Sequence, residues 1–131
     1  MLVLSLSGLV YASGDNATGE LGDSTREPSP RLKLIDEISH LPMKHIEAGS
    51  FSASISEEGS HVFLWGTGAF GEFLTPHRVK KIRGETQSLS IGSGFGVAVT
   101  MQGFLYSWGD NTSGELGDGD YNPKKTPQLM N

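Results

Sequence analysis

The chain has 131 residues and no cysteine, which excludes disulfide bonds, thiolate metal sites and thiol catalysis. Its net charge of −5 argues against nucleic acid or an anionic membrane as a general partner. Glycine is abundant, with 18 residues, and charged residues make up only 19% of the chain, a balance typical of a turn-rich all-β protein.

The apolar opening of the chain predicts a pair of strands. Residues 2–6 and 9–12 are mostly apolar, and the glycine of Ser7-Gly8 between them supplies the positive φ of a tight turn. The opening superficially resembles a secretory leader, but it lacks the positive residues that such leaders carry, and it aligns with later units of the chain. We therefore interpret it as a hairpin.

A glycine-rich phrase follows and recurs near the end of the chain. Residues 14–23 and 109–118 are identical at eight of ten positions, and an eroded copy occupies residues 66–73. Repeats spaced by some tens of residues predict an array of like units. The positions expected to define the repeat are Gly14, Gly19, Leu21, Gly22, Trp65, Gly66, Gly71, Trp108, Gly109, Gly114, Leu116 and Gly117.

Each unit shows the same order of strands. First strands are expected at 44–49 and 88–92, second strands at 2–6, 51–56 and 95–101, and aromatic third strands at 9–12, 61–65 and 104–108. Fourth strands are expected at 31–35, 78–82 and 128–130, with Pro30, Pro76 and Pro127 at or just before their starts. Residues 36–41 predict at most one helical turn.

Four-stranded antiparallel units in series are the blades of a β-propeller. We predict an all-β chain of about three blades, an incomplete ring, divided as part of a blade at 1–42, a blade at 43–86 and a blade at 87–131. Leu21 and Leu116 are expected to plug the gap between neighbouring blades, with Trp65 and Trp108 packed in the same layers.

Residues 8–23 and, more closely, 103–118 with Trp108-Gly109 resemble the repeat of the regulator of chromosome condensation family. The resemblance implies a seven-bladed propeller, of which this chain would be a fragment. Roles known in the family are nucleotide exchange on the small GTPase Ran, chromatin docking, ultraviolet sensing and scaffolding in large proteins. One departure is Ser13, which stands where the other units carry Trp65 and Trp108.

Motifs that could bind a cofactor or a metal have a structural explanation in each case. Residues 66–71 match G-x-G-x-x-G, but Pro76 soon after them opposes the helix that a dinucleotide site needs. Asp15-Asn16 and Asp110-Asn111 lack the alternating spacing of a calcium loop, and Asx side chains in turns bond backbone groups two residues on. We expect no cofactor and no metal.

The sequence offers no catalytic constellation. Its four histidines, at positions 40, 45, 61 and 77, are scattered over different strands and loops. The basic segment 77–83 has two interpretations: a contact for an acidic partner, or a solvated outer strand that lysine and arginine protect from edge pairing. The second is favoured because the rest of the chain is acidic.

We therefore expect a non-enzymatic scaffold that contacts a protein partner, either a small GTPase or subunits of a large assembly, through loops after the glycine phrase. The alternative is guanine nucleotide exchange on a Ran-like GTPase. The expected setting is intracellular, in the nucleus, the cytoplasm, or a cytoskeletal or ciliary assembly. The candidate contact residues are Ser24, Thr25, Arg26, Asp118, Asp120 and Tyr121.

Overall fold

The computed structural model describes residues 1–49, 51–92, 94–117 and 119–130, and in them the chain folds into three antiparallel sheets. The first sheet has three strands and the other two have four each. The elements are β1 (Leu2–Leu4), β2 (Val10–Gly14), β3 (Ser29–Leu34), the 3-10 turn η1 (Asp36–Ile38), β4 (Met43–Ala48), β5 (Ser52–Ser56), β6 (Val62–Gly68), β7 (Gly71–Arg78), β8 (Thr86–Ile91), β9 (Phe95–Thr100), β10 (Leu105–Gly109) and β11 (Lys124–Met130).

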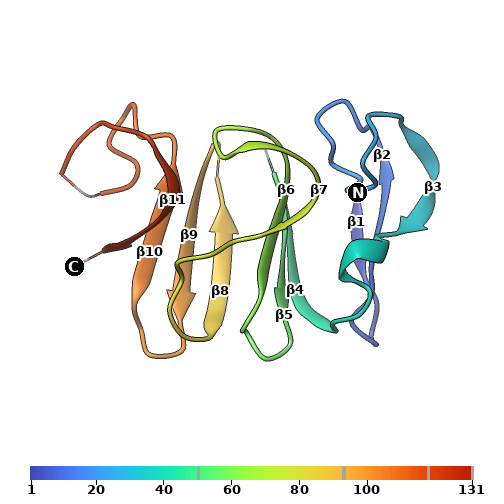
Figure 1. The fold of residues 1–131 in the computed structure, drawn as a ribbon, viewed down its shortest axis with the longest axis horizontal. Helices are drawn as coiled ribbons and strands as arrows, with labels where there is room; N and C mark the ends of the chain where they lie inside the picture. The colour runs from blue at the N-terminus through green and yellow to red at the C-terminus, as the bar shows by residue number, and fades with distance from the viewer. Residues whose placement is uncertain (50, 93, 118, 131) are drawn as a thin grey trace.

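The three sheets lie side by side in chain order (Figure 1). Their inner strands are β1, β4 and β8, of which β4 contacts both β1 and β8, while β3, β7 and β11 form the outer edges of their sheets. This is the arrangement of propeller blades and confirms the predicted fold class. Within the described ranges η1 is the sole helical element, and none could cross a membrane.

Apolar side chains fill the two gaps between the sheets. Along β6 they alternate: Phe63 and Trp65 face the first sheet, whereas Val62 and Leu64 face the third. The first apolar layer contains Val10, Ala12, Leu21, Ile35, Ile38, Met43, Phe63 and Trp65. The second apolar layer contains Phe51, Ala53, Ile55, Val62, Leu64, Phe70, Leu89, Ala98, Tyr106 and Trp108. Leu21 lies with Trp65, as expected for an inter-blade plug.

The predicted bounds of the outer strands are wrong, because each proline lies inside its strand. Pro30, Pro76 and Pro127 fall within β3, β7 and β11, at the point where pairing with the neighbouring strand shifts register. A proline has no N–H to donate, and a bulge on an edge strand is a place where none is needed. The prolines therefore mark irregularities in the strands and not their starts.

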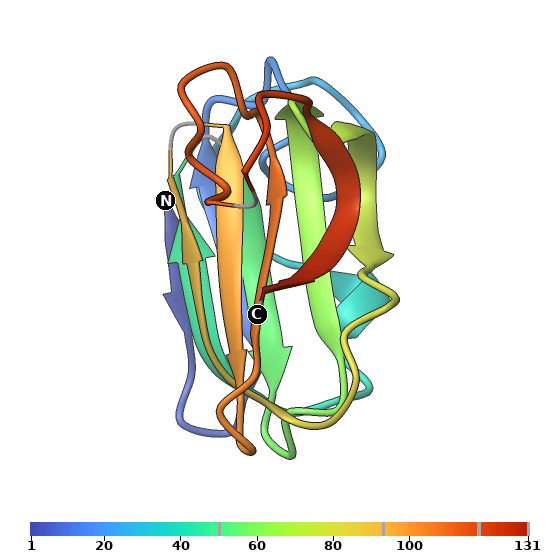
Figure 2. The ribbon, with the colours of Figure 1, turned by 90° about the vertical axis from the view of Figure 1, so that its left-hand side faces the viewer.

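The middle unit departs most from the prediction. Strand β7 begins at Gly71 and ends at Arg78, so the expected strand 78–82 does not form. Gly68 pairs with Gly71, which leaves Ala69 and Phe70 as a two-residue turn in place of the longer loops of the other units. The basic residues after Arg78 consequently leave the sheet and cross toward β8 (Figures 1 and 2).

Phe70 performs in this short turn the packing role that Leu21 has in the first unit. Its ring meets Phe51 edge-on at a centroid distance of 4.7 Å and lies 5.7 Å from the ring of Trp108. Gly109 makes room for it, since a Cβ there would lie 2.9 Å from the Phe70 ring and 2.4 Å from the Gly94 carbonyl oxygen. In the middle unit, one aromatic side chain on a short turn thus does the packing that the longer loop does in the first unit.

Removing the Phe70 ring should open a cavity in the second apolar layer. We expect Phe70→Ala to lower the free energy of unfolding by about 3–5 kcal/mol in urea denaturation. Phe104→Ala is the matched control, because Phe104 is 53% exposed, and it should change stability by less than about 0.5 kcal/mol. Equal losses in the two variants would contradict this account of the turn.

Candidate functional site

Three connections lie at the same end of the sheets and form the candidate site, here called the loop end (Figure 1). They are the loop 15–28 between β2 and β3, the turn 69–70 between β6 and β7, and the loop 110–123 between β10 and β11. The two long loops contain most of each glycine phrase.

A buried asparagine organises the first long loop. The Asn16 side chain is 1% exposed, and its Nδ2 donates to the carbonyl oxygens of Thr25 and Glu27 at 2.8 and 2.9 Å. Its Oδ1 accepts from the Leu21 N–H at 2.9 Å. One amide group therefore holds three separate points of the loop, which supplies hydrogen bonds that buried backbone groups require.

The second long loop is built in the same way. Asn111 is fully buried, and its Nδ2 donates to the carbonyl oxygens of Asp120 and Asn122, each at 2.9 Å. Its Oδ1 accepts from the Leu116 N–H at 3.1 Å. These bonds reach five to eleven residues along the chain, not two as the Asx-turn interpretation expects. The repeated phrase thus encodes a loop clamp.

Glycines set the path of the backbone around each asparagine. The Gly19 N–H donates to the Asn16 carbonyl oxygen and the Gly22 N–H to that of Gly19, both at 3.1 Å, and Gly114 and Gly117 repeat these bonds. Gly19 has a φ of +84°, and a Cβ there would lie 2.6 Å from Leu74 Cδ2 of the second sheet. Glycine is favoured there by the left-handed conformation, and a larger residue would also have to displace the Leu74 side chain.

The first loop also rests on the neighbouring sheet. The Trp65 indole N–H donates to the Glu20 carbonyl oxygen and the Thr67 hydroxyl to that of Thr18, each at 2.8 Å. The Ser24 N–H donates to the Leu74 carbonyl oxygen at 2.9 Å.

The predicted contact residues fall into two groups. Thr25 and Asp120 hold the buried asparagines and so shape the loops. Arg26 is exposed and forms an ion pair of 3.0 Å with Glu72 of β7. Tyr121 is 73% exposed.

Ser24, with a φ of +68°, is also exposed, whereas Asp118 lies outside the described residues. The middle unit separates the two loops, so these residues share one end of the molecule and do not form a single cluster (Figure 1).

Electrostatics reinforce the first loop. Burial alone would raise the pKa of Asp23, but hydrogen bonds from the Lys33 ammonium, Thr25 and Asn16 outweigh it and hold the pKa well below its usual value. Lys33 Nζ lies 2.8 Å from the carboxylate. Hydrogen bonding to Thr18 likewise lowers the pKa of Glu20 against the opposing effect of burial. Both groups favour the charged, folded loop.

Comparison with known proteins identifies the repeat. The sequence profile of the "Regulator of chromosome condensation (RCC1) repeat" matches residues 102–131. Human E3 ubiquitin-protein ligase HERC2 is 30% identical over 98% of the chain, and so is the ultraviolet-B receptor UVR8 of Arabidopsis thaliana. The chain is made of RCC1 repeats. It spans 3% of HERC2 and 31% of UVR8.

Solved RCC1 propellers share the fold of this chain. Prp20p of Saccharomyces cerevisiae superposes with a TM-score of 0.87 at 19% identity, over 99% of this chain and 36% of that one. Human WBSCR16 gives the same TM-score at 17% identity, over 99% of this chain and 35% of that one. The RCC1 repeats described above therefore have the blade geometry of these propellers.

The asparagine clamp predicts a large effect from a small substitution. Asn16→Ala should lower the free energy of unfolding by about 2–4 kcal/mol, because it removes the partner of two carbonyl oxygens and of the Leu21 N–H. Asn16→Asp should lower it by as much, since a carboxylate cannot donate to those carbonyls. Asp15→Ala is the control: Asp15 is repeated as Asp110 but exposed, and it should be nearly neutral in urea unfolding.

The pKa of Asp23 makes the stability of the chain depend on pH. A depressed pKa stabilises the fold above the unfolded value of about 3.9, and this contribution is lost as the pH falls toward the folded value. The free energy of unfolding should therefore fall more steeply in the wild type than in Asp23→Asn between about pH 4 and pH 2. Parallel pH profiles of the free energy of unfolding in the two proteins would contradict this prediction.

Proposed function

We propose that this chain is part of a non-catalytic interaction scaffold that contacts a protein partner through its loop end. The observation that carries the proposal is the contrast within each long loop between a clamped interior and an exposed exterior. Asn16 and Asn111 are buried, while Tyr121 is 73% exposed and Arg26 is exposed although it is paired with Glu72. Loops held on a rigid scaffold are well suited to recognition, because little conformational entropy is lost on binding.

The fold itself is compatible with many functions, so the proposal depends on the loops. Tyrosine and arginine are the residue types most often found at the energetic centres of protein interfaces. Solved structures of the same fold support an interaction role in a coarse sense. One is described with the binding properties of Prp20p to Gsp1p and histones, and another is of Kap60 bound to yeast RCC1 (Prp20).

The second candidate is guanine nucleotide exchange on a small GTPase. The comparison with Prp20p supports this candidate, because Prp20p has the fold of this chain and is described as binding Gsp1p. Exchange acts by distorting the nucleotide site of the GTPase, so it needs no nucleophile on the propeller. A Ran nucleotide-release assay with the protein that carries these blades would separate the two functions: accelerated release of labelled GDP supports exchange.

Site-specific photo-crosslinking tests the scaffold proposal. A benzophenone amino acid at Tyr121 should crosslink a discrete partner in cells, and excess unlabelled chain should compete for it. The control position is Met101, which is 57% exposed in the turn between β9 and β10 at the opposite end of the third sheet. Equal crosslinking from both positions would overturn the assignment of contacts to the loop end.

A further inference from the structure

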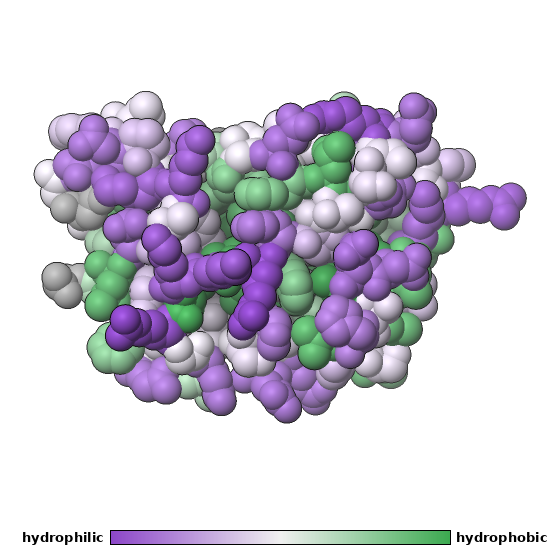
Figure 3. Space-filling model, viewed as in Figure 1, coloured by the Kyte–Doolittle hydropathy of each residue, from purple (hydrophilic) through white to green (hydrophobic). Residues whose placement is uncertain are grey.

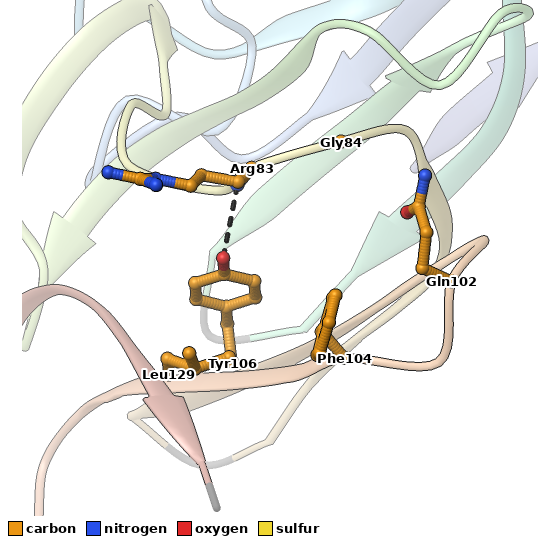
Figure 4. A pocket seen from close by; sticks show the side chains of 6 residues that line it. All are labelled: Arg83, Gly84, Gln102, Phe104, Tyr106 and Leu129. Carbon is orange, nitrogen blue, oxygen red and sulfur yellow. Dashed lines mark hydrogen bonds between the residues drawn. The ribbon is translucent and has the colours of Figure 1, made fainter.

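A groove of two hollows lies along the outer part of the second and third sheets, and its second hollow reaches the loop end at Phe70. Its first part is a hollow of about 390 Å³ lined by Arg83, Gly84, Gln102, Phe104, Tyr106 and Leu129 (Figure 4). Its second part, of about 200 Å³, is lined by residues of β6, β7, β10, β11 and the segment after β7, and by Phe70 of the turn 69–70. Together they are here called the basic groove.

The floor of the basic groove is largely apolar. Tyr106 and Trp108 are two residues apart on β10, so they face the same side; Tyr106 lines the first hollow and Trp108 the second, and both are buried. Leu129 of β11 is paired with Tyr106, and Pro127 continues the same wall. Phe104 extends the floor at one end and remains 53% exposed.

The opposite wall is the segment that leaves the sheet after β7. The Val79 N–H donates to the Val62 carbonyl oxygen at 2.8 Å, and the Arg83 N–H donates to the Tyr106 hydroxyl at 3.2 Å (Figure 4). Val79 and Ile82 pack on the second apolar layer. These anchors fix the wall while its charged side chains remain exposed. Figure 3 shows hydrophilic side chains beside apolar surface where this segment crosses the face.

The rim of the groove carries positive charge only. Among the described residues that line the two hollows there is no aspartate or glutamate, whereas four cations line them: Lys80, Lys81, Arg83 and Lys125. The chain as a whole has a net charge of −5, so this concentration of cations runs against its general balance. Low-dielectric walls beside such charges strengthen the attraction of anions.

We propose that the basic groove binds an extended acidic peptide segment of a protein partner, with an apolar side chain anchored in the hollow beside Phe104. The carboxylates of the peptide would pair with the lysine rim, and its apolar side chain would cover the exposed ring of Phe104. None of the described residues that line the hollow beside Phe104 belongs to the loop end, so a test of this anchor is distinct from that of the scaffold proposal.

Fluorescence polarisation with a labelled peptide of alternating glutamate and leucine tests the groove. The full chain should bind this probe, and binding should weaken with added salt because the charges are exposed. The double variant Lys80→Glu and Lys125→Glu should weaken binding by at least about tenfold, since it sets like charges against the peptide. Phe104→Ala should weaken it about fivefold by removing the anchor contact.

Two controls make the outcome decisive. Lys44→Glu changes an exposed lysine on β4 outside the groove and should leave binding unchanged. A lysine–leucine peptide should not bind. The proposal is overturned if the Lys80/Lys125 double variant binds as the wild type does, if Lys44→Glu weakens binding equally, or if a labelled single-stranded oligonucleotide binds more tightly than the acidic peptide. Circular dichroism confirms that each variant is folded.

Discussion

In the part of the chain that the structure describes, each sheet buries its apolar side chains against a neighbouring sheet, and the rest of the structure follows from that constraint. The strands are short, and none of the described sheets encloses a core of its own. Stability therefore depends on how well the gap between two sheets is filled. Trp65 and Leu21 fill the first gap, and Trp108 and Phe70 fill the second. The loop clamp and the basic groove both rest on these layers.

The sequence predicts the architecture well because the repeated glycine phrase is a strong local signal. Gly19, Gly22 and their counterparts lie at the expected turns, and Leu21 packs in the expected layer. The outer strands were harder to delimit. A proline usually argues against a strand interior, and only the register shift near Pro76 and Pro127 shows why these prolines are accommodated.

The loop clamp and the groove could not be read from residue types. The shorter bonds of Asn16 join main-chain groups, which every residue possesses, so side-chain types mark its partners only through Asp23 and Thr25. The groove forms where β10, β11 and a segment from the second sheet meet, and the basic segment 77–83 was the only part of it visible in the sequence. The interpretation of this segment as an outer strand fails because Gly71 starts β7 early.

The prolines at the strand irregularities affect how this molecule can pair with other proteins. A regular outer strand would offer a row of N–H and C=O groups to any passing polypeptide, which is how amyloid growth and strand swapping begin. Pro30, Pro76 and Pro127 each remove a donor and bend the backbone in the outermost strand of a sheet. The outer strands are thus poor templates for fibril growth, and other proteins are recognised through side chains.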